Sequence, residues 1–389
     1  MPGPLRSLML SRLTIPIIQA PMLGATTEAI AIAVSNAGGL GSFAAAGSSP
    51  EQIKTSVEKI RAATRQPFAV NIFVLDPAEP DPAVVRAAMD LLAPWRERYG
   101  LPPQSIPNTW AQNTAAQIDA IIESAPPAAS FTFGCLAPEQ VSRLKAAGIY
   151  VIGTATTVAE AKAWEAAGAD AICAQGIEAG GHRGTFLADI HASAIGTLSL
   201  VSTICAAVEA PVIAAGGITT GEAVAAALML GADAVQVGTA YLLAEEAVTP
   251  EPQRQAILDA PDDPTRLTRA ISGRYARGID NEFMRAMRLN EDSIAPYPVQ
   301  NALTGELRAA ALKAGSTDVA SLWAGQSVKL ARPGKAADIT MNLWRQAQAV
   351  MRARTTRFGA VVGVTPNARR MGSNHYRGPH TFQEYGGEE

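Results

Sequence analysis

Two glycine-containing turns in the second half of the chain could bind an anion through backbone amides. They are AAGGITTGEA at 214–223 and QVGTAY at 236–241, each directly after a short apolar run. Gly216 and Gly217 let N–H groups approach an anion, and a helix beginning nearby would point its positive end at the same place. Gly238 and Thr239 add N–H groups and a hydroxyl. Glycines that merely turn the chain are the alternative, but two such turns in succession favour a phosphate site.

A second candidate cluster is AQGIEAGGHRGTF at 174–186. Gln175 carries an amide that can donate and accept, which suits the pyrimidine edge of a flavin. Gly180 and Gly181 would let the backbone pass close beneath a flat ring. His182 could take a proton from carbon or stabilise a developing anion, since an imidazole has an ordinary pKa of about 6.5. A solvated loop histidine is the alternative, and the neighbouring Arg183 could bind an anion or bond to backbone.

Two earlier positions could also face a ligand. Asn71 lies inside the apolar run 68–73, and a buried asparagine needs hydrogen-bond partners. Met22 follows the run that ends at QAP. The alternatives are an amide bonded to neighbouring backbone for Asn71 and a core position for Met22.

The elements that position these residues are eight short runs rich in Val, Ile, Ala and Phe. They are apolar at nearly every position, as expected of parallel strands covered by helices on both faces. The runs are 15–20, 40–43, 68–73, 129–133, 149–153, 171–175, 212–215 and 234–237.

Helices are predicted between most of these runs. Thr157 can cap one of them, with Glu160 three residues further on, and Gly168 would end it before the next strand. Doubly wound sheets use similar turns. However, phosphate commonly binds after strands seven and eight of a barrel, so we expect an α/β fold of the (β/α)8 TIM-barrel type.

The alternation of apolar runs and predicted helices stops after the eighth run, and we therefore divide the chain into three predicted parts. Residues 1–248 would form the barrel. Residues 249–352 look helical without strands and would form a subdomain over the barrel mouth. Residues 353–389 combine arginine, glycine, proline and asparagine with little apolar periodicity, so we expect a mobile tail.

Composition narrows the function classes. The 389 residues are 17% charged with a formal net charge of −3, which does not favour nucleic acid as a partner. No apolar stretch reaches the roughly 18 residues of a membrane span, and the N-terminus lacks a signal-peptide core, so we expect a cytoplasmic protein. The three cysteines form no CxxC pair, which argues against structural zinc and disulfides.

Taken together, these motifs resemble the nitronate monooxygenase family, formerly called 2-nitropropane dioxygenases, and its class I members in particular. The resemblance covers roughly residues 12–345. It depends on an ordered set of segments: PIIQAPM, SNAGGLGSF at 35–43, the Asn71 strand, AQGIEAGGHRGTF, AAGGI, QVGT, YPVQN at 297–301 and LWAGQ at 322–326.

The resemblance implies a barrel with non-covalent FMN and no metal. The FMN phosphate would be held by Gly216, Gly217, Gln236, Val237, Gly238 and Thr239. The ring or ribityl chain would contact Met22, Asn71, Gln175, Gly180 and Gly181. His182 falls on the family's catalytic histidine, and Tyr241 and Tyr297 would close the substrate pocket, although a buried, backbone-bonded tyrosine explains either one equally well.

The implied reaction is oxidation of alkyl nitronates, with propionate 3-nitronate as the family's characteristic substrate. One electron passes from the nitronate to FMN, O2 combines with the radicals, and a carbonyl compound and nitrite form. The histidine would abstract the α-proton of neutral nitroalkanes, whereas a nitronate needs no base. Detoxification would be the biological role, carried out by a monomer or homodimer.

Three other functions fit some of the same motifs. A flavin-dependent enoyl-acyl-carrier-protein reductase shares SNAGGLG, EAGGH and AAGGI, and an NADH:quinone reductase is a further flavin enzyme. A catalytically silent flavin-binding barrel is an alternative of another class. HRGTF and the segments YPVQN and LWAGQ favour the monooxygenase, and the presence of His182 disfavours the silent barrel.

Overall fold

The computed structural model describes residues 9–362 of the chain, with side chains to residue 354. Two compact units are distinguished, Met1–Val350 and Met351–Glu389. The barrel and the site belong to the first unit. Among the described residues, no helix is long and apolar enough to cross a membrane.

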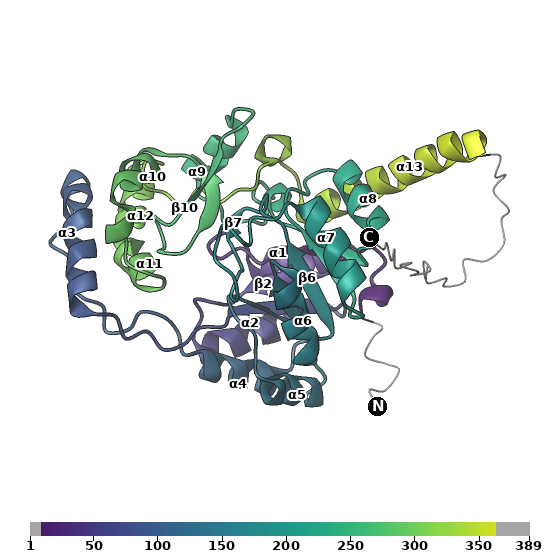
Figure 1. The fold of residues 1–389 in the computed structure, drawn as a ribbon, viewed down its shortest axis with the longest axis horizontal. Coiled ribbons are helices and arrows are strands. Elements are labelled where there is room, and N and C mark those ends of the chain that lie inside the picture. The colour runs from purple at the N-terminus through teal and green to yellow at the C-terminus, as the bar shows by residue number, and fades with distance from the viewer. Residues whose placement is uncertain (1–8, 363–389) are drawn as a thin grey trace, which may run out of the picture. The chain divides into compact units, whose positions relative to one another are not determined.

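Eight parallel strands form the barrel, and each overlaps one of the eight predicted runs (Figure 1). Their order in the sheet is β1-β9-β8-β6-β5-β4-β3-β2. A parallel bridge between Ile18 and Leu40 joins β1 to the start of β2, so the ring closes. The strands are β1 (Ile17–Gln19), β2 (Gly41–Ala44), β3 (Phe68–Phe73), β4 (Ala128–Thr132), β5 (Tyr150–Ala155), β6 (Ala171–Gln175), β8 (Val212–Ala215) and β9 (Ala234–Val237).

Helices pack around this barrel, as the α/β prediction required. They are α1 (Glu28–Asn36), α2 (Pro50–Ala63), α4 (Thr114–Ser124), α5 (Pro138–Ala146), α6 (Val158–Ala166), α7 (Thr197–Ala207) and α8 (Gly221–Met229). The first part of α13 (Ala336–Val362), up to Val350, belongs to the same unit. Apolar strand residues fill the interior, and Leu10 of the short helix η1 (Leu10–Arg12) packs against them. The TIM-barrel prediction is confirmed.

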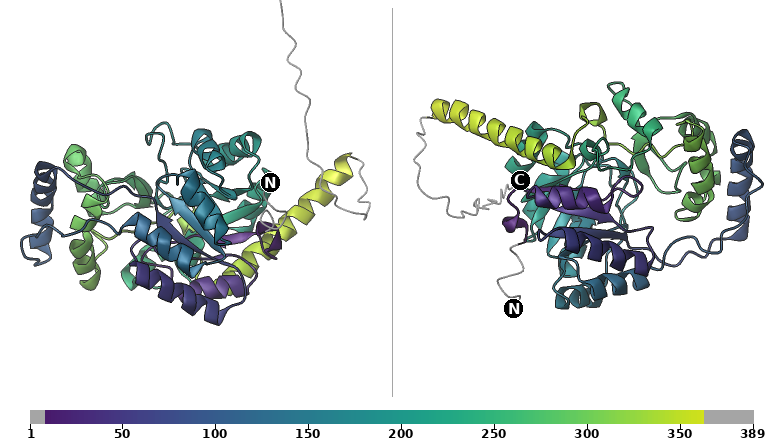
Figure 2. Two further views of the ribbon diagram at one scale, coloured as in Figure 1. Left: turned by 90° about the horizontal axis from the view of Figure 1, so that it is seen from below. Right: turned by 180° about the vertical axis from the view of Figure 1, so that it is seen from behind.

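A second group of elements follows β9 in the chain. It contains α9 (Glu251–Leu258), α10 (Glu282–Met287), α11 (Val299–Leu303), α12 (Gly305–Lys313) and the short helices η2 (Thr239–Tyr241), η3 (Arg288–Ser293) and η4 (Val328–Leu330). An earlier segment, α3 (Pro82–Arg98), packs against α10–α12 and away from the barrel (Figure 2). Its Val85, Ala88 and Leu92 are buried there because their spacing places them on one helical face.

The prediction that residues 249–352 contain no strands was wrong. β10 (Thr265–Thr268) and β11 (Ala276–Ile279) form an antiparallel pair, and β11 also pairs with the two-residue β7 (Gly181–His182). The sequence signal was weak because these strands alternate polar residues and glycine with only single large apolar residues.

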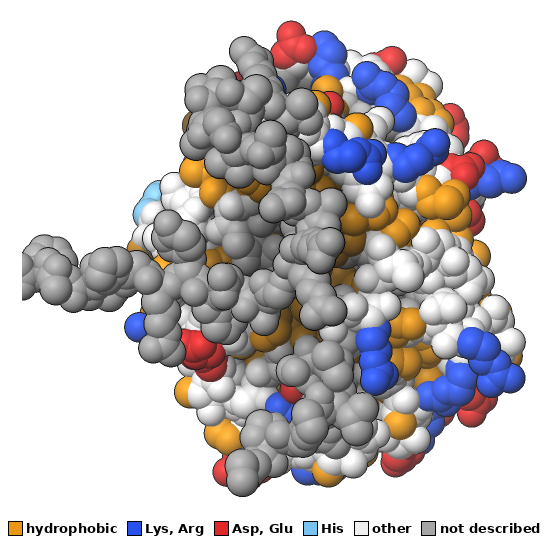
Figure 3. Space-filling view, turned by 90° about the vertical axis from the view of Figure 1, so that its right-hand side faces the viewer, with side chains coloured by type: hydrophobic (Ala, Val, Ile, Leu, Met, Phe, Trp, Pro, Cys, Tyr) orange, Lys and Arg blue, Asp and Glu red, His pale blue; other side chains and the backbone are white. Residues whose placement is uncertain are grey.

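The predicted tail at 353–389 begins inside a helix, because α13 extends to Val362. The remaining residues of that prediction, 363–389, lie outside the described residues. On the face shown in Figure 3, acidic and basic side chains of the described residues are interspersed with hydrophobic ones.

Candidate active site

A cavity of about 440 Å³ lies at the C-terminal ends of the barrel strands. Ligand sites of TIM barrels lie at this end, and cavities of this size hold small molecules or cofactors. Most of the predicted site residues line it: Met22, Asn71, Gln175, Gly180, Gly181, His182, Gly216, Gly217, Gln236, Gly238, Thr239 and Tyr297.

Two predicted residues do not line this cavity. The side chain of Tyr241 is fully buried, and its hydroxyl lies 2.7 Å from the Thr340 hydroxyl of α13. This corrects the placement of Tyr241 in the substrate pocket, because it is a core residue. Val237 is also fully buried, and its carbonyl accepts the Ala20 amide at 2.8 Å.

The two glycine turns lie next to each other in this wall, because β8 and β9 are paired strands. Gly216 and Gly217 have φ angles of 116° and 67°, a region that side chains rarely adopt. Helix α8 begins after them, with Thr220 as its cap. The Gln236 side chain lines the cavity and makes no hydrogen bond with any described residue. Free amide donors and a helix N-terminus are features that bind phosphate.

The side chains predicted to contact the flavin ring already make hydrogen bonds within the protein, which leaves them fewer free polar atoms than the sequence suggested. Asn71 uses its amide hydrogens on the carbonyl and hydroxyl of Ser130, so only its carbonyl oxygen is free. Gln175 donates to the His182 carbonyl and accepts the Gly184 amide. An added Cβ at Gly180 would lie 2.5 Å from the Ala324 carbonyl carbon, so packing against backbone explains this glycine.

His182 lies in the cavity wall on β7, surrounded by aromatic rings. The ring centroids nearest to it belong to Phe133 at 5.4 Å, Trp323 at 5.5 Å, Tyr297 at 5.7 Å and Phe73 at 6.2 Å. Burial, reinforced by the positive charges of Arg274 and Arg308, lowers the pKa of His182 to about 3. A neutral imidazole in such a site can accept a proton.

Buried charged side chains hold the loop that carries His182. The guanidinium of Arg183 donates to the carbonyls of Gln175, Thr156 and Ser193, so it binds backbone and no carboxylate. Arg274 donates to the carbonyls of Arg183 and Thr185. This settles the two roles open for Arg183 in favour of backbone bonding.

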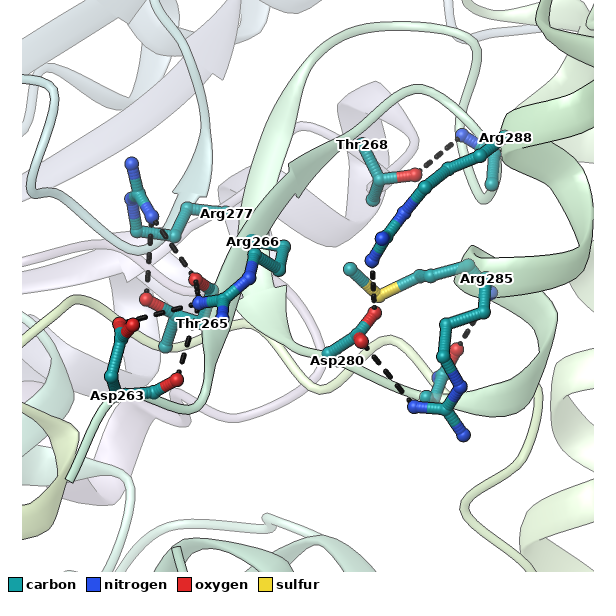
Figure 4. A network of polar contacts seen from close by, with 11 residues as sticks. Asp263, Thr265, Arg266, Thr268, Arg277, Asp280, Arg285 and Arg288 are labelled. Carbon is teal, nitrogen blue, oxygen red and sulfur yellow. Dashed lines mark hydrogen bonds and ion pairs between the residues drawn. The ribbon is translucent and has the colours of Figure 1, made fainter. Parts of the chain in front are cut away.

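Arg277 of β11 continues this support. Its Nε donates to the Ile177 carbonyl at 3.0 Å, and its Nη1 donates to the Thr265 hydroxyl at 3.3 Å (Figure 4). Asp280, just beyond β11, accepts from Arg285 and Arg288. The three-stranded sheet that includes β7 is therefore tied both to the loop after β6 and to α10.

Glu160 is the functional residue whose role the sequence did not reveal. Thr157 caps α6 as predicted. The Glu160 carboxylate does not complete a capping box, however, and instead accepts from Thr156 and from residues of the His182 loop. The donors are the amide and hydroxyl of Thr156, the hydroxyl of Thr185 and the amides of Phe186 and Leu187.

Arg308 was also missed, because nothing in its local sequence separates it from a surface residue of a helix. Among the described residues it is the one Arg, Lys, Asp or Glu side chain that lines the cavity. It donates to the Ser321 hydroxyl and to both oxygens of Asn301, none of which is a carboxylate. Its positive charge therefore has no counterion in the wall.

A parallel barrel whose strand ends carry a cavity, two glycine turns and a histidine of lowered pKa has the architecture of TIM-barrel enzymes. The nitronate monooxygenase family model matches residues 6–346. A nitronate monooxygenase of Pseudomonas aeruginosa is 45% identical over 332 residues, which are 84% of this chain and 95% of that protein. A probable nitronate monooxygenase of Staphylococcus aureus strain Newman is 41% identical over 337 residues, covering 86% and 95%.

Among solved structures, nitroalkane oxidase from Streptomyces ansochromogenes superposes with a TM-score of 0.83 and 37% identity. The match covers 90% of this chain and 99% of that one. The chain belongs to the nitronate monooxygenase family, and it is an oxidoreductase.

Replacing Glu160 with Gln should loosen the His182 loop. The five donors would meet an amide with one acceptor oxygen, and each unmatched buried donor costs about 1–3 kcal/mol. We expect a lower melting temperature than in a variant at an exposed carboxylate, Glu139→Gln. Burial raises the pKa of Glu160, but the hydrogen bonds from Thr156, Phe186 and Leu187 outweigh it, so the pKa is lowered from 4.5.

The stability that Glu160 contributes is therefore complete above the ordinary carboxyl pKa and is lost as pH falls through the lowered folded-state pKa. Melting curves of parent and Glu160→Gln should converge on acidification below about pH 4.5. If the difference in melting temperature between parent and variant stays constant across that pH range, the role given to this carboxylate is wrong.

Proposed function

We propose that this chain is an FMN-dependent nitronate monooxygenase that oxidises alkyl nitronates with O2 to carbonyl compounds and nitrite. The observation that supports this most directly is the neutral, half-buried His182 in a cavity bordered by two glycine turns, in a chain of this family. FMN, when bound, would supply the electron acceptor that links nitronate oxidation to O2.

The residues of the cavity fit this cofactor in chemical type. The N–H groups of the turns at Gly216–Gly217 and Gly238–Thr239, with the unpaired amide of Gln236, would bind the phosphate. Val237 would contribute backbone only, since its side chain is buried away from the cavity. The free carbonyl oxygen of Asn71 would accept from the ring or ribityl chain, and Met22, Gln175, Gly180 and Gly181 would border it.

The protein's own part in the reaction is to exclude water, place the nitronate and hold or move one proton. Phe73, Phe133 and Trp323 provide an apolar wall around His182. A nitronate enters already deprotonated, so His182 has no proton to remove. With a neutral nitroalkane the imidazole would take the α-proton first.

Arg308 supports a preference for nitronates that carry a second anionic group, such as propionate 3-nitronate. Its charge borders the cavity without a carboxylate partner. An anion in a desolvated site gains more from such a charge than it would in water. Tyr297 and Asn301 border the same part of the cavity.

Oxygen uptake by the purified protein tests the function. We expect yellow protein that consumes O2 with propionate 3-nitronate, releases nitrite and gives the same rate with and without NADH. Rapid anaerobic bleaching of the flavin by NADH would instead assign the chain to the enoyl or quinone reductases. Yellow protein that is inert with nitronates, nitroalkanes, enoyl thioesters and quinones would favour the silent flavin-binding barrel.

Replacing His182 with Asn should separate the two substrate types. We expect oxygen uptake with ethylnitronate to persist and uptake with nitroethane to fall by about 100-fold or more, the usual contribution of a general base. The proton-accepting form exists above the folded-state pKa of about 3, so kcat/KM of the parent for nitroethane should not fall between pH 8 and about pH 5 on account of this histidine. Equal rates of variant and parent on nitroethane, at equal FMN content, would refute the assignment.

Replacing Arg308 with Gln should weaken the preference for nitronates that carry a second anionic group. Losing a charge-assisted hydrogen bond costs about 1.5–3 kcal/mol, so kcat/KM for propionate 3-nitronate should fall by about 10- to 100-fold. The value for ethylnitronate, which has no carboxylate, should change little, and Arg308→Lys should retain part of the preference because it keeps the charge. The idea fails if both substrates lose activity to the same extent.

A further inference from the structure

The imidazole of His182 has one hydrogen-bond partner among the described residues. Its Nε2 lies 2.8 Å from the hydroxyl oxygen of Ser272. Ser272 is 1% exposed and belongs to the turn between β10 and β11, far in sequence from the loop after β6. The pairing of β7 with β11, in which His182 is opposite Ala276, brings the two residues together.

The turn around Ser272 leaves this hydroxyl little freedom. Gly273 has a φ of 84°, and a Cβ there would lie 2.3 Å from the Ala295 carbonyl oxygen, so the turn is packed tightly against neighbouring backbone. The Gly273 amide also donates to the Arg269 carbonyl at 2.7 Å. The hydroxyl of Ser272 is thus presented to His182 by fixed backbone.

Counting hydrogens identifies a direction for the bond to His182 that gives every neighbouring group a partner. A serine hydroxyl has one hydrogen to donate and two lone pairs. Ser272 donates to the Arg274 carbonyl at 3.1 Å and accepts the Arg274 amide at 3.4 Å. When this hydrogen is given to the Arg274 carbonyl, the hydroxyl accepts from His182, and the imidazole donates from Nε2.

We propose that Ser272 is a positioning residue that holds His182 in the Nε2–H tautomer, so that Nδ1 is the atom that accepts the substrate proton. The inference rests on the proposed function, in which His182 is the base for neutral nitroalkanes. In that step the α-C–H bond breaks, an N–H bond forms at Nδ1, and the C–H electron pair delocalises over the carbon and the nitro group to give the nitronate. Nε2 keeps its hydrogen and its bond to Ser272 throughout.

The surroundings of His182 make this bond important. Arg274 and Arg308 disfavour a positive imidazole, and Tyr297 is the other titratable group that faces it. The rings of Phe73 and Phe133 have no hydrogen-bonding group, and the Trp323 ring makes no hydrogen bond to His182 among the described contacts. Without the Ser272 acceptor, nothing else in the described protein would hold the Nε2 proton in place.

Nitrogen-15 NMR of the histidine-labelled holoenzyme tests the tautomer directly. The His182 signals are identified by their absence in His182→Asn, and the couplings of ring nitrogens to ring protons distinguish the two neutral forms. We expect the Nε2–H pattern in the parent and in Ser272→Thr, which keeps the hydroxyl, and a mixture in Ser272→Ala. An Nδ1–H pattern in the parent would overturn the proposal, whether or not the enzyme oxidises nitronates.

Kinetics provide the second measurement. In Ser272→Ala we expect kcat/KM for nitroethane to fall by about ten-fold, the loss of one buried hydrogen bond, while ethylnitronate oxidation is unchanged. Ser272→Thr should restore the nitroethane rate. A parallel fall for both substrates, without recovery in Ser272→Thr, would make Ser272 merely structural and overturn the proposal. Failure of the parent on every nitronate would instead refute the proposed function.

Discussion

The geometry of the site depends on buried charged side chains that bond to loop backbone. The segment after β6 crosses the barrel mouth without a strand ladder of its own beyond the two residues of β7, so its amides and carbonyls need other partners. The Glu160 carboxylate accepts hydrogen bonds from amides of this segment, while the guanidinium groups of Arg183 and Arg274 donate to carbonyls of the same segment. A buried charge is tolerated only when such bonds compensate its desolvation, so each of these side chains and the loop conformation require one another. His182 gains its fixed position from this arrangement.

Two arginines, one of them also a support of the loop, shape the electrostatics around His182. Arg274 and Arg308 both lower the pKa of His182, and no Asp or Glu is among the described residues that line the cavity. Positive charge without a counterion favours an anionic ligand, and it disfavours protonation of the nearby imidazole. In the proposed function, attraction of a nitronate and maintenance of a neutral base therefore have one physical cause. A carboxylate close to the imidazole, as in many acid–base sites, would oppose both.

The barrel could be predicted from the sequence because strands covered on both faces are continuously apolar. The glycine turns after two of these strands were recognisable as candidate site residues, and they line the cavity. The strands β10 and β11 could not, because segments such as ARGI owe their conformation to Arg277 bonding to the Ile177 carbonyl and to pairing with β7. Glu160 was recognised only as a neighbour of a helix cap, since its loop partners are 25 or more residues away. Tyr241 was misplaced because a tyrosine after a site motif resembles a pocket residue, whereas its partner Thr340 is 99 residues away.

The cavity wall is built from two kinds of segment, and only one of them leaves recognisable motifs in the sequence. The glycine turns after β8 and β9 lie at strand ends, where the backbone conformation restricts the residue type and leaves recognisable motifs. Arg308, Tyr297 and Trp323 come from the segments after the barrel, where a helix or loop of ordinary composition can present different side chains to the same space. Function on a shared barrel is determined by such grafted residues. Motifs in this chain therefore identify the residues at the strand ends, while the proposed preference among nitronates rests on positions that only the folded structure brings to the cavity.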